Sequence, residues 1–261
     1  MNIVVCIKQV PGTTNVKIDP QTNTLIRQGI ENIINPFDTY ALEEGVRLRE
    51  QHGGKVTVIT MGPPQAEDAL RESISLGADE TVLLSDSAFA GADTWATAFT
   101  LSRAVAKLEQ YDIIICGRQT VDGDTGQVGP ELAEMLDIPF IAYVSQIEEI
   151  NEGYIRVRRM VEEGHEIMET SLPAVITVNK EINIPRLPSL RGIMKSKSTK
   201  IDTWGIQELG VDSNMVGLPG SSTQVIKVFF PQRISQAEIL EGDVESQVDS
   251  LIDKLKDASL L

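Results

Sequence analysis

Residues 116–130, which read CGRQTVDGDTGQVGP, hold the types and spacing best suited to chemistry in this sequence. They follow a short apolar run and precede a stretch with helical patterning, residues 131–136. Gly117, Gly123, Gly126 and Gly129 allow the backbone to approach a ligand closely. A strand, a glycine-rich turn and a helix N-terminus together favour a phosphate group, because free N–H groups and the helix dipole point toward the anion. The segment predicts a phosphate-containing ligand, with a purely structural loop as the alternative.

Two carboxylates complicate this interpretation. Asp122 and Asp124 would repel a bare anion, so ribose hydroxyls, turn capping or loop geometry are the better assignments for them. The segment matches neither the P-loop pattern nor GxGxxG, so these general motifs do not decide its role.

Other small or polar groups follow the predicted strands. Residues 6–8 end the first strand, and Met61 ends another. Residues 35–38, Asn-Pro-Phe-Asp, precede a helix that Asp38 is expected to cap. Ligands of open α/β sheets bind beyond the carboxyl ends of strands, so these groups are candidates for the same site. The alternatives are a simple helix start for residues 35–38 and packing for Met61.

Residues 88–98, AFAGADTWATA, form a second segment rich in small side chains. Asp93 is expected to cap a helix, and Thr94 and Thr97 share one face of it. Small residues here would leave space for a flat ring or a phosphate. A capped helix with tight packing is the equally weighted alternative.

The sequence contains no recognisable catalytic constellation. His52 and His165 lie near glycines and are expected at the surface, and Cys6 and Cys116 lie in apolar runs and are expected to be buried thiols. Zinc-protease, paired-cysteine and GxSxG patterns are absent from the sequence. Any redox or group-transfer chemistry would therefore belong to a bound cofactor.

The apolar runs predict the elements that position these residues. Runs at 3–7, 56–60, 81–84 and 113–116 indicate buried parallel strands, with helical patterns between them. This alternation predicts a doubly wound, mostly parallel, Rossmann-like α/β sheet over residues 1–200. Beyond Pro139, a hairpin signal at 151–153 and a strand at 175–178 are placed as antiparallel additions.

The last part of the sequence has a different character. Residues 201–235 show little periodicity, and 236–261 form an amphipathic helical pattern. Costly exposed apolar residues, among them Trp204, Phe229 and Phe230, favour an arm that packs on a partner subunit over a disordered tail. We therefore expect a second part, residues 201–261.

Composition excludes several classes of protein. Among 261 residues, 38 acidic residues outnumber 23 basic ones, giving a formal charge of -15. This balance argues against nucleic-acid binding, which needs a basic face. No apolar stretch approaches the ~20 residues of a membrane span, and the N-terminus does not resemble a signal peptide. Unpaired buried cysteines fit a reducing cytoplasm.

A basic segment stands out against this acidic background. Between positions 180 and 200, six basic residues accompany a single acid, Glu181. The basic residues are Lys180, Arg186, Arg191, Lys195, Lys197 and Lys200. The apolar residues Leu187, Leu190, Ile193 and Met194 lie among them. An apolar anchor surrounded by charges is typical of a transient protein interface, with a solvated loop as the main alternative.

The sequence resembles the beta subunit of electron-transfer flavoproteins over nearly its full length. The resemblance is carried by VCIKQVPGT at 5–13, NPFDTYALEEGVRLRE at 35–50 and MGPPQAEDALRESISLGADE at 61–80. Residues 117–139 and INIPRLPSLRGIMKSK at 182–197 complete it. The motifs at 35–50, 117–139 and 182–197 are highly specific in combination.

The resemblance implies a heterodimer with an FAD-carrying alpha subunit and an adenine nucleotide in the pocket described above. It places the docking loop at 185–197, with Leu187, Leu190, Ile193 and Met194 facing an acyl-CoA dehydrogenase-like or reductase-like flavoprotein and Leu190 as the anchor. The positions that we assign to cofactor binding are Cys6, Asn35, Pro36, Phe37, Asp38, Met61, Asp93, Thr94, Thr97, Gly117, Arg118, Gln119, Thr120, Val121, Asp122, Gly123, Asp124, Thr125, Gly126, Gln127 and Val128.

The identity of the nucleotide is the open question. Ordinary members of the family hold a structural AMP, whereas members from anaerobes that bifurcate electrons hold a second FAD. Residues 89–98 and 123–130 resemble the bifurcating members more closely, although Trp95 replaces a smaller apolar residue. We therefore expect FAD, reduced by NADH, with ferredoxin or flavodoxin as one electron acceptor and the dehydrogenase as the other. AMP without a redox role is the alternative.

Overall fold

The computed structural model describes residues 1–261 except 13–16, 19–24, 27–30, 152 and 228–236. The chain divides into two compact units, Met1–Ile226 and Lys227–Leu261. Each unit is described by itself.

The first unit is built on a nine-stranded sheet with the order β11-β10-β9-β12-β8-β1-β6-β7-β13. Its strands are β1 (Asn2–Ile7), β6 (Lys55–Met61), β7 (Glu80–Leu84), β8 (Ile113–Gly117), β9 (Phe140–Ile150), β10 (Tyr154–Val161), β11 (Gly164–Ser171), β12 (Ala174–Val178) and β13 (Asp202–Trp204). Short antiparallel pairs join β2 (Gln9–Pro11) to β5 (Asn32–Ile34) and β3 (Lys17–Ile18) to β4 (Leu25–Ile26). The four apolar runs at 3–7, 56–60, 81–84 and 113–116 are all strands of this sheet, as predicted.

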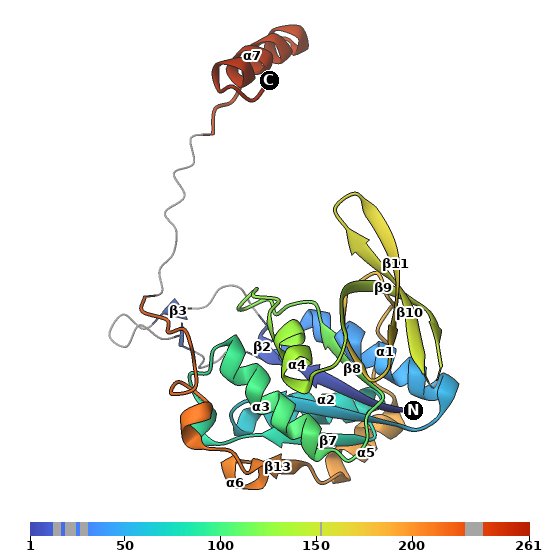
Figure 1. Ribbon diagram of the computed structural model, residues 1–261. Helices are drawn as coiled ribbons and strands as arrows, with labels where there is room; N and C mark the ends of the chain where they lie inside the picture. The colour runs from blue at the N-terminus through green and yellow to red at the C-terminus, as the bar shows by residue number, and fades with distance from the viewer. Residues whose placement is uncertain (13–16, 19–24, 27–30, 152, 228–236) are drawn as a thin grey trace. The chain divides into compact units, whose positions relative to one another are not determined.

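Helices cover both faces of the sheet (Figure 1). The helices of this unit are α1 (Pro36–His52), α2 (Glu67–Leu76), α3 (Thr94–Lys107), α4 (Val128–Leu136), α5 (Leu190–Ser198) and α6 (Ile206–Leu209), with short 3-10 turns η1 (Pro64–Ala66), η2 (Ser87–Phe89) and η3 (Ser213–Met215). In β1, Ile3 and Val5 pack in the core under α1 and α2, whereas Val4 and Cys6 pack in the core under α3 and α4. Two apolar faces on each parallel strand explain the continuous apolar runs and confirm the doubly wound α/β fold.

One strand runs differently from the prediction. β12 pairs parallel with both β8 and β9, and antiparallel pairing occurs between β9, β10 and β11. β12 is buried along its whole length, which is typical of a strand inside a parallel sheet. Its continuous apolar sequence, AVITV, carried that signal, and placing it among the antiparallel additions was wrong.

The boundary between the two parts also lies later than expected. β13 pairs parallel with β7, and Leu209 and Val216 are buried in the core beside α3. The Lys107 ammonium lies 5.0 Å from the ring centre of Trp204. Residues 201–226 therefore belong to the first unit, and the expected packing of 201–261 on a partner subunit stays a prediction. Phe229 and Phe230 lie outside the described residues.

The second unit contains α7 (Val244–Asp257), which confirms the predicted C-terminal helix within 236–261. Val248 and Leu251 on this helix are about half exposed. Its packing on a partner subunit stays a prediction. None of the helices in the described ranges has the length and apolar character needed to cross a membrane.

Candidate nucleotide site

The candidate site lies in the middle of the sheet, where the chain continues to one side after β1 and to the other side after β8. β1 and β8 are neighbours and run parallel, with β6 and β7 on one side and β12 and β9 on the other. Open α/β sheets bind ligands beyond the carboxyl ends of strands at such a switch in strand order. Lys8 follows β1 and Gly117 ends β8, so the segments that leave these strands form the two walls of the site.

Asn35 fastens the loop after β8 to the start of α1. Its side chain is buried, and Nδ2 donates to the carbonyl of Gln119 at 2.8 Å. The backbone N–H of Val121 donates to Asn35 Oδ1 at 3.1 Å. One amide therefore satisfies two backbone groups of the loop, so Asn35 holds the loop in place.

Asp38 is expected to cap α1, and the structure shows a different role. Asn35 occupies the N-cap position, while Asp38 lies in the first turn and accepts a hydrogen bond from the Lys8 backbone N–H at 2.7 Å. Burial raises the pKa of Asp38 to about 7, although hydrogen bonds from the Lys8 and Gly117 backbones lower it. The site therefore holds a carboxyl group that titrates near neutral pH.

Gly117 is required by the close approach of these two segments. A Cβ at this position would lie 2.3 Å from Asp38 Oδ1 and 2.7 Å from the carbonyl carbon of Phe37. Any larger residue would push the start of α1 away from the end of β8.

The two carboxylates that oppose an anion are both engaged by neighbours. Lys8 Nζ pairs with Asp122 Oδ2 at 2.7 Å, and Gln119 Nε2 donates to Asp124 Oδ1. Partial burial alone would raise the pKa of Asp122, but the Lys8 ammonium holds it below its ordinary value. Lys8 thus neutralises the negative charge of Asp122 in the loop. Lys8 belongs to the stretch 6–8 that the sequence placed near the site, but it was not among the positions assigned to cofactor binding.

The second half of the loop offers free donors. Asp124 has φ 53° and Gly126 has φ 64°, so the backbone turns sharply here. Within the described residues, the backbone N–H groups of 125–129 have no hydrogen-bond acceptor. α4 begins at Val128 rather than at 131, so these donors lie at the N-terminal, positive end of the helix dipole. This arrangement fits a phosphate or pyrophosphate group.

The first turn of α3 lies beside this loop. Thr94 Oγ1 is 3.4 Å from Gln127 Oε1 and 3.1 Å from Glu131 Oε1. The second carboxylate oxygen of Glu131 is buried without a partner among the described residues. Thr97 is half-buried one turn later on the same helix. Thr94 and Glu131 thus lie at the loop's end, where an unpaired acceptor could receive a ligand hydroxyl.

Asp93 caps α3 as predicted, and its carboxylate is occupied within the chain. Ala96 N–H donates to Oδ1 at 3.0 Å, and Thr223 donates its backbone N–H to Oδ2 at 2.8 Å. Leu218 covers the small residues ahead of the helix, because a Cβ on Gly91 would lie 3.1 Å from Leu218 Cβ. Leu218 therefore packs beside Gly91, although Ala90 and Gly91 are exposed, and the space predicted there for a ring stays a prediction.

The remaining predicted residues lie around the two walls. Cys6 and Cys116 face each other across β1 and β8 and are free, buried thiols, as predicted. The Arg118 guanidinium lies 5.1 Å from the ring centre of Tyr143. Tyr143 has φ 61° in β9 and was not predicted as part of the site. The other predicted positions here are exposed or half-buried at the same edge: Pro36, Phe37, Met61, Thr120, Gly123 and Thr125.

The predicted docking segment is ordered and largely apolar on its outer side. Leu187, Leu190 and Met194 are 88%, 83% and 74% exposed, and Ile193 is 37% exposed. The segment was expected to be a loop, but residues from Leu190 onward form α5. Ser189 begins this helix, since its side chain accepts from the Gly192 N–H at 3.0 Å. His52 and His165, which the sequence placed at the surface, are exposed.

Comparison with known proteins decides the family. The family model "Electron transfer flavoprotein domain" matches residues 22–209. An electron transfer flavoprotein subunit beta from Thermoanaerobacterium thermosaccharolyticum is 52% identical over 258 residues, covering 98% of both chains. The chain belongs to the electron transfer flavoprotein beta-subunit family. A family member from Acetobacterium woodii, "Caffeyl-CoA reductase-Etf complex subunit CarD", is 43% identical over the whole of both chains. "Protein FixA" of Azotobacter vinelandii is 45% identical, over 93% of this chain and 89% of that protein.

Proposed function

We propose that this beta subunit binds FAD in the site between β1 and β8 and, with an FAD-carrying alpha subunit, bifurcates electrons from NADH. The observation that carries this proposal is the set of free N–H groups at 125–129 on the exposed side of the switch point. Their number and their place at the start of α4 suit a pyrophosphate better than a neutral ligand.

The chain's own residues would bind and orient the cofactor. Lys8 would keep Asp122 ionised and leave its charge balanced, so that Asp122 can accept a ribose hydroxyl without repelling the phosphates. Asn35 would keep the loop ordered before the ligand arrives. When bound, FAD would accept a hydride from NADH and release electrons one at a time. The similarity to a subunit named for a caffeyl-CoA reductase complex supports an acyl-CoA dehydrogenase-like or reductase-like partner. The other electron acceptor in this proposal is ferredoxin or flavodoxin.

A structural AMP in the same site is the second candidate. One observation favours it: Leu218 packs beside Gly91 and Thr223 bonds to Asp93, which narrows the space first expected for a flavin ring there. The single phosphate of AMP would use fewer of the free N–H groups at 125–129 than a pyrophosphate would.

The deciding experiment is the nucleotide content of the complex purified with its alpha subunit. Heat-released nucleotides are separated by chromatography and counted per heterodimer. Two FAD support the proposal, and one FAD with one AMP refutes it in favour of the second candidate.

Cytoplasmic location is part of the proposal, and fractionation of cells producing the complex would test it.

Docking is tested separately with Leu190→Ala. We expect the rate of dehydrogenase reduction to fall more than the rate of reduction of an artificial dye by NADH. Equal losses of both rates would show that the exposed apolar segment does not dock the dehydrogenase.

A further inference from the structure

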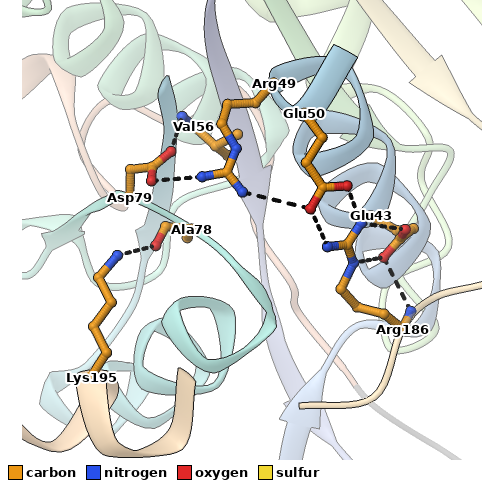
Figure 2. Close-up of polar contacts among 8 residues, drawn as sticks. All are labelled: Glu43, Arg49, Glu50, Val56, Ala78, Asp79, Arg186 and Lys195. Atoms are coloured by element: carbon orange, nitrogen blue, oxygen red, sulfur yellow. Dashed lines mark hydrogen bonds and ion pairs between the residues drawn. The ribbon is translucent and has the colours of Figure 1, made fainter. Parts of the chain in front are cut away.

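The docking segment is fastened at its start by one arginine. Arg186 Nε and Nη2 donate to the two carboxylate oxygens of Glu43, at 2.8 and 3.0 Å. Nη1 and Nη2 donate to those of Glu50, at 2.6 and 3.0 Å. The Arg186 backbone N–H also donates to Glu43 Oε2, at 3.1 Å. Figure 2 shows the guanidinium between the two carboxylates of α1. A planar fork that meets two carboxylates in this way fixes the direction of the chain as well as its position.

The end of the segment is fastened to a different part of the fold. Lys195 Nζ donates to the carbonyl of Ala78 at 3.0 Å, as Figure 2 also shows. Arg71 Nη1 on α2 donates to the carbonyl of Ser196 at 2.5 Å. A Cβ on Gly192 would lie 2.2 Å from the carbonyl oxygen of Ser75, so α5 packs directly on the backbone of α2.

The two fastenings bracket the exposed apolar residues. Leu187, Leu190 and Met194 lie between or beside the fixed positions 186, 192 and 195, and they are the most exposed of the predicted docking residues. Exposed apolar side chains on a segment without such contacts would otherwise collapse onto the nearest apolar surface or sample many positions. Here polar contacts on the inner side hold the backbone, so the apolar side chains stay outward.

The positive charge of Arg186 is therefore neutralised within the chain, by Glu43 and Glu50. Glu43 is 7% exposed, and Arg186 is its ion-pair partner among the described residues. Glu50 continues the network to Arg49 at 3.9 Å, and Arg49 pairs with Asp79 at 2.9 Å. The basic segment thus holds two kinds of cation. Arg186 and Lys195 are bound inward, whereas Arg191 is exposed on α5 and has no ion pair within the described residues.

We propose that Arg186 is a positioning residue that preorganises the apolar docking surface of Leu187, Leu190 and Met194 for the dehydrogenase-like partner. This inference rests on the proposed docking function. We call the contacts of Arg186 with Glu43 and Glu50 the clamp. A surface that is already ordered loses less conformational freedom on binding, so the clamp increases affinity for the partner without touching it. It acts on complex formation, so it should change KM for the partner and leave kcat at saturating partner unchanged.

Arg186→Gln is the test, and Arg191→Gln is its matched control. Both variants remove one positive charge from the same segment, so any effect on long-range steering is shared. The variants are made in the complex with the alpha subunit. Hydrogen exchange of peptides from 183–199 reports the order of the segment. Electron transfer to an acyl-CoA dehydrogenase, titrated at low and high salt, gives KM and kcat.

We expect Arg186→Gln to accelerate exchange across 187–199 about tenfold and to raise KM about tenfold, with kcat unchanged and little dependence on salt. Arg191→Gln should leave exchange unchanged, and any increase in KM should disappear at high salt. Glu50→Gln keeps the buried Glu43 contact, so it should give a smaller effect of the same kind and covers the case in which Arg186→Gln folds poorly.

Unchanged exchange at 187–199 in Arg186→Gln would overturn the clamp. Faster exchange with unchanged KM would overturn its role in docking, provided that Leu190→Ala raises KM. If Leu190→Ala has no effect on the dehydrogenase, the docking function itself fails, and the exchange data still decide whether the clamp exists.

Discussion

Replacing Asn35 by alanine should weaken nucleotide binding because Asn35, which the sequence assigns to the cofactor site, holds the loop after β8 in place. The variant removes two hydrogen bonds, from Asn35 Nδ2 to the Gln119 carbonyl and from the Val121 N–H to Asn35 Oδ1. Each such bond contributes about 0.5–1.5 kcal/mol net. Gln119 is half-buried and Val121 is exposed, so water can replace part of what is lost. We therefore expect a cost near the middle of the range, about 2 kcal/mol for the pair.

The free energy lost with these two hydrogen bonds sets an upper limit on how far nucleotide affinity can fall. If only the ordered loop binds the nucleotide, the dissociation constant rises by the inverse of the ordered fraction, up to about 30-fold for 2 kcal/mol. The assay is nucleotide retained by the purified complex after dialysis, followed by calorimetric titration of the stripped complex with FAD and with AMP.

Thr39→Ala is the matched control for this experiment. Thr39 lies in the same first part of α1, and its hydroxyl donates to the Pro36 carbonyl at 2.7 Å without reaching the loop. Similar dissociation constants for the two variants would refute the role of Asn35 as a tether. A loss confined to Asn35→Ala, with an unchanged far-ultraviolet spectrum, would support it.

Two further predictions concern the same junction. Because burial raises the pKa of Asp38 to about 7 from an ordinary 3.8, the folded state binds more protons between these values, and the free energy of unfolding should fall as pH rises from 4 to 7, by up to roughly 4 kcal/mol. Asp38→Asn should remove most of this slope in urea titrations at several pH values; an unchanged slope would assign it to other groups. Gly117→Ala should lower the free energy of unfolding by about 1–3 kcal/mol, since its Cβ meets Asp38 Oδ1 at 2.3 Å. Gly123→Ala, whose Cβ would lie 3.4 Å from Thr120 Oγ1, should lower it far less, and equal losses would contradict the close-approach argument.

The sequence was sufficient for the parts of the fold that local pattern controls. Continuous apolar runs located the parallel strands, because a strand buried on both faces needs apolar residues at every position. Glycines and a following helical pattern likewise located the loop at 116–130. The misplacement of β12 had a different source, since its pairing partners are determined by how the whole sheet is assembled and not by its own composition.

Contacts between residues far apart in the sequence could not be predicted from local sequence patterns. Lys8 and Asp122 are separated by 114 positions, and their pairing depends on β1 and β8 being neighbours in the sheet. Leu218 covers Gly91 for the same kind of reason. The small side chains at 90–92 looked equally suited to a ligand or to a segment of the chain itself. Only the path of residues 201–226 distinguishes the two, and the sequence of that stretch carries little periodicity.

α1 connects the two proposed functions physically. Its N-terminal end contributes Asn35 and Asp38 to the nucleotide site, and its later turns contribute Glu43 and Glu50 to the docking clamp. The helix has 17 residues, so it spans about 25 Å as a single rigid element. Its buried face packs on β1, β8 and β6 in the middle of the sheet. If both proposals hold, one helix and the sheet beneath it would determine the distance between the nucleotide and the docked partner. Electron transfer depends steeply on distance, so this arrangement would give a physical reason for anchoring the docking segment to that helix.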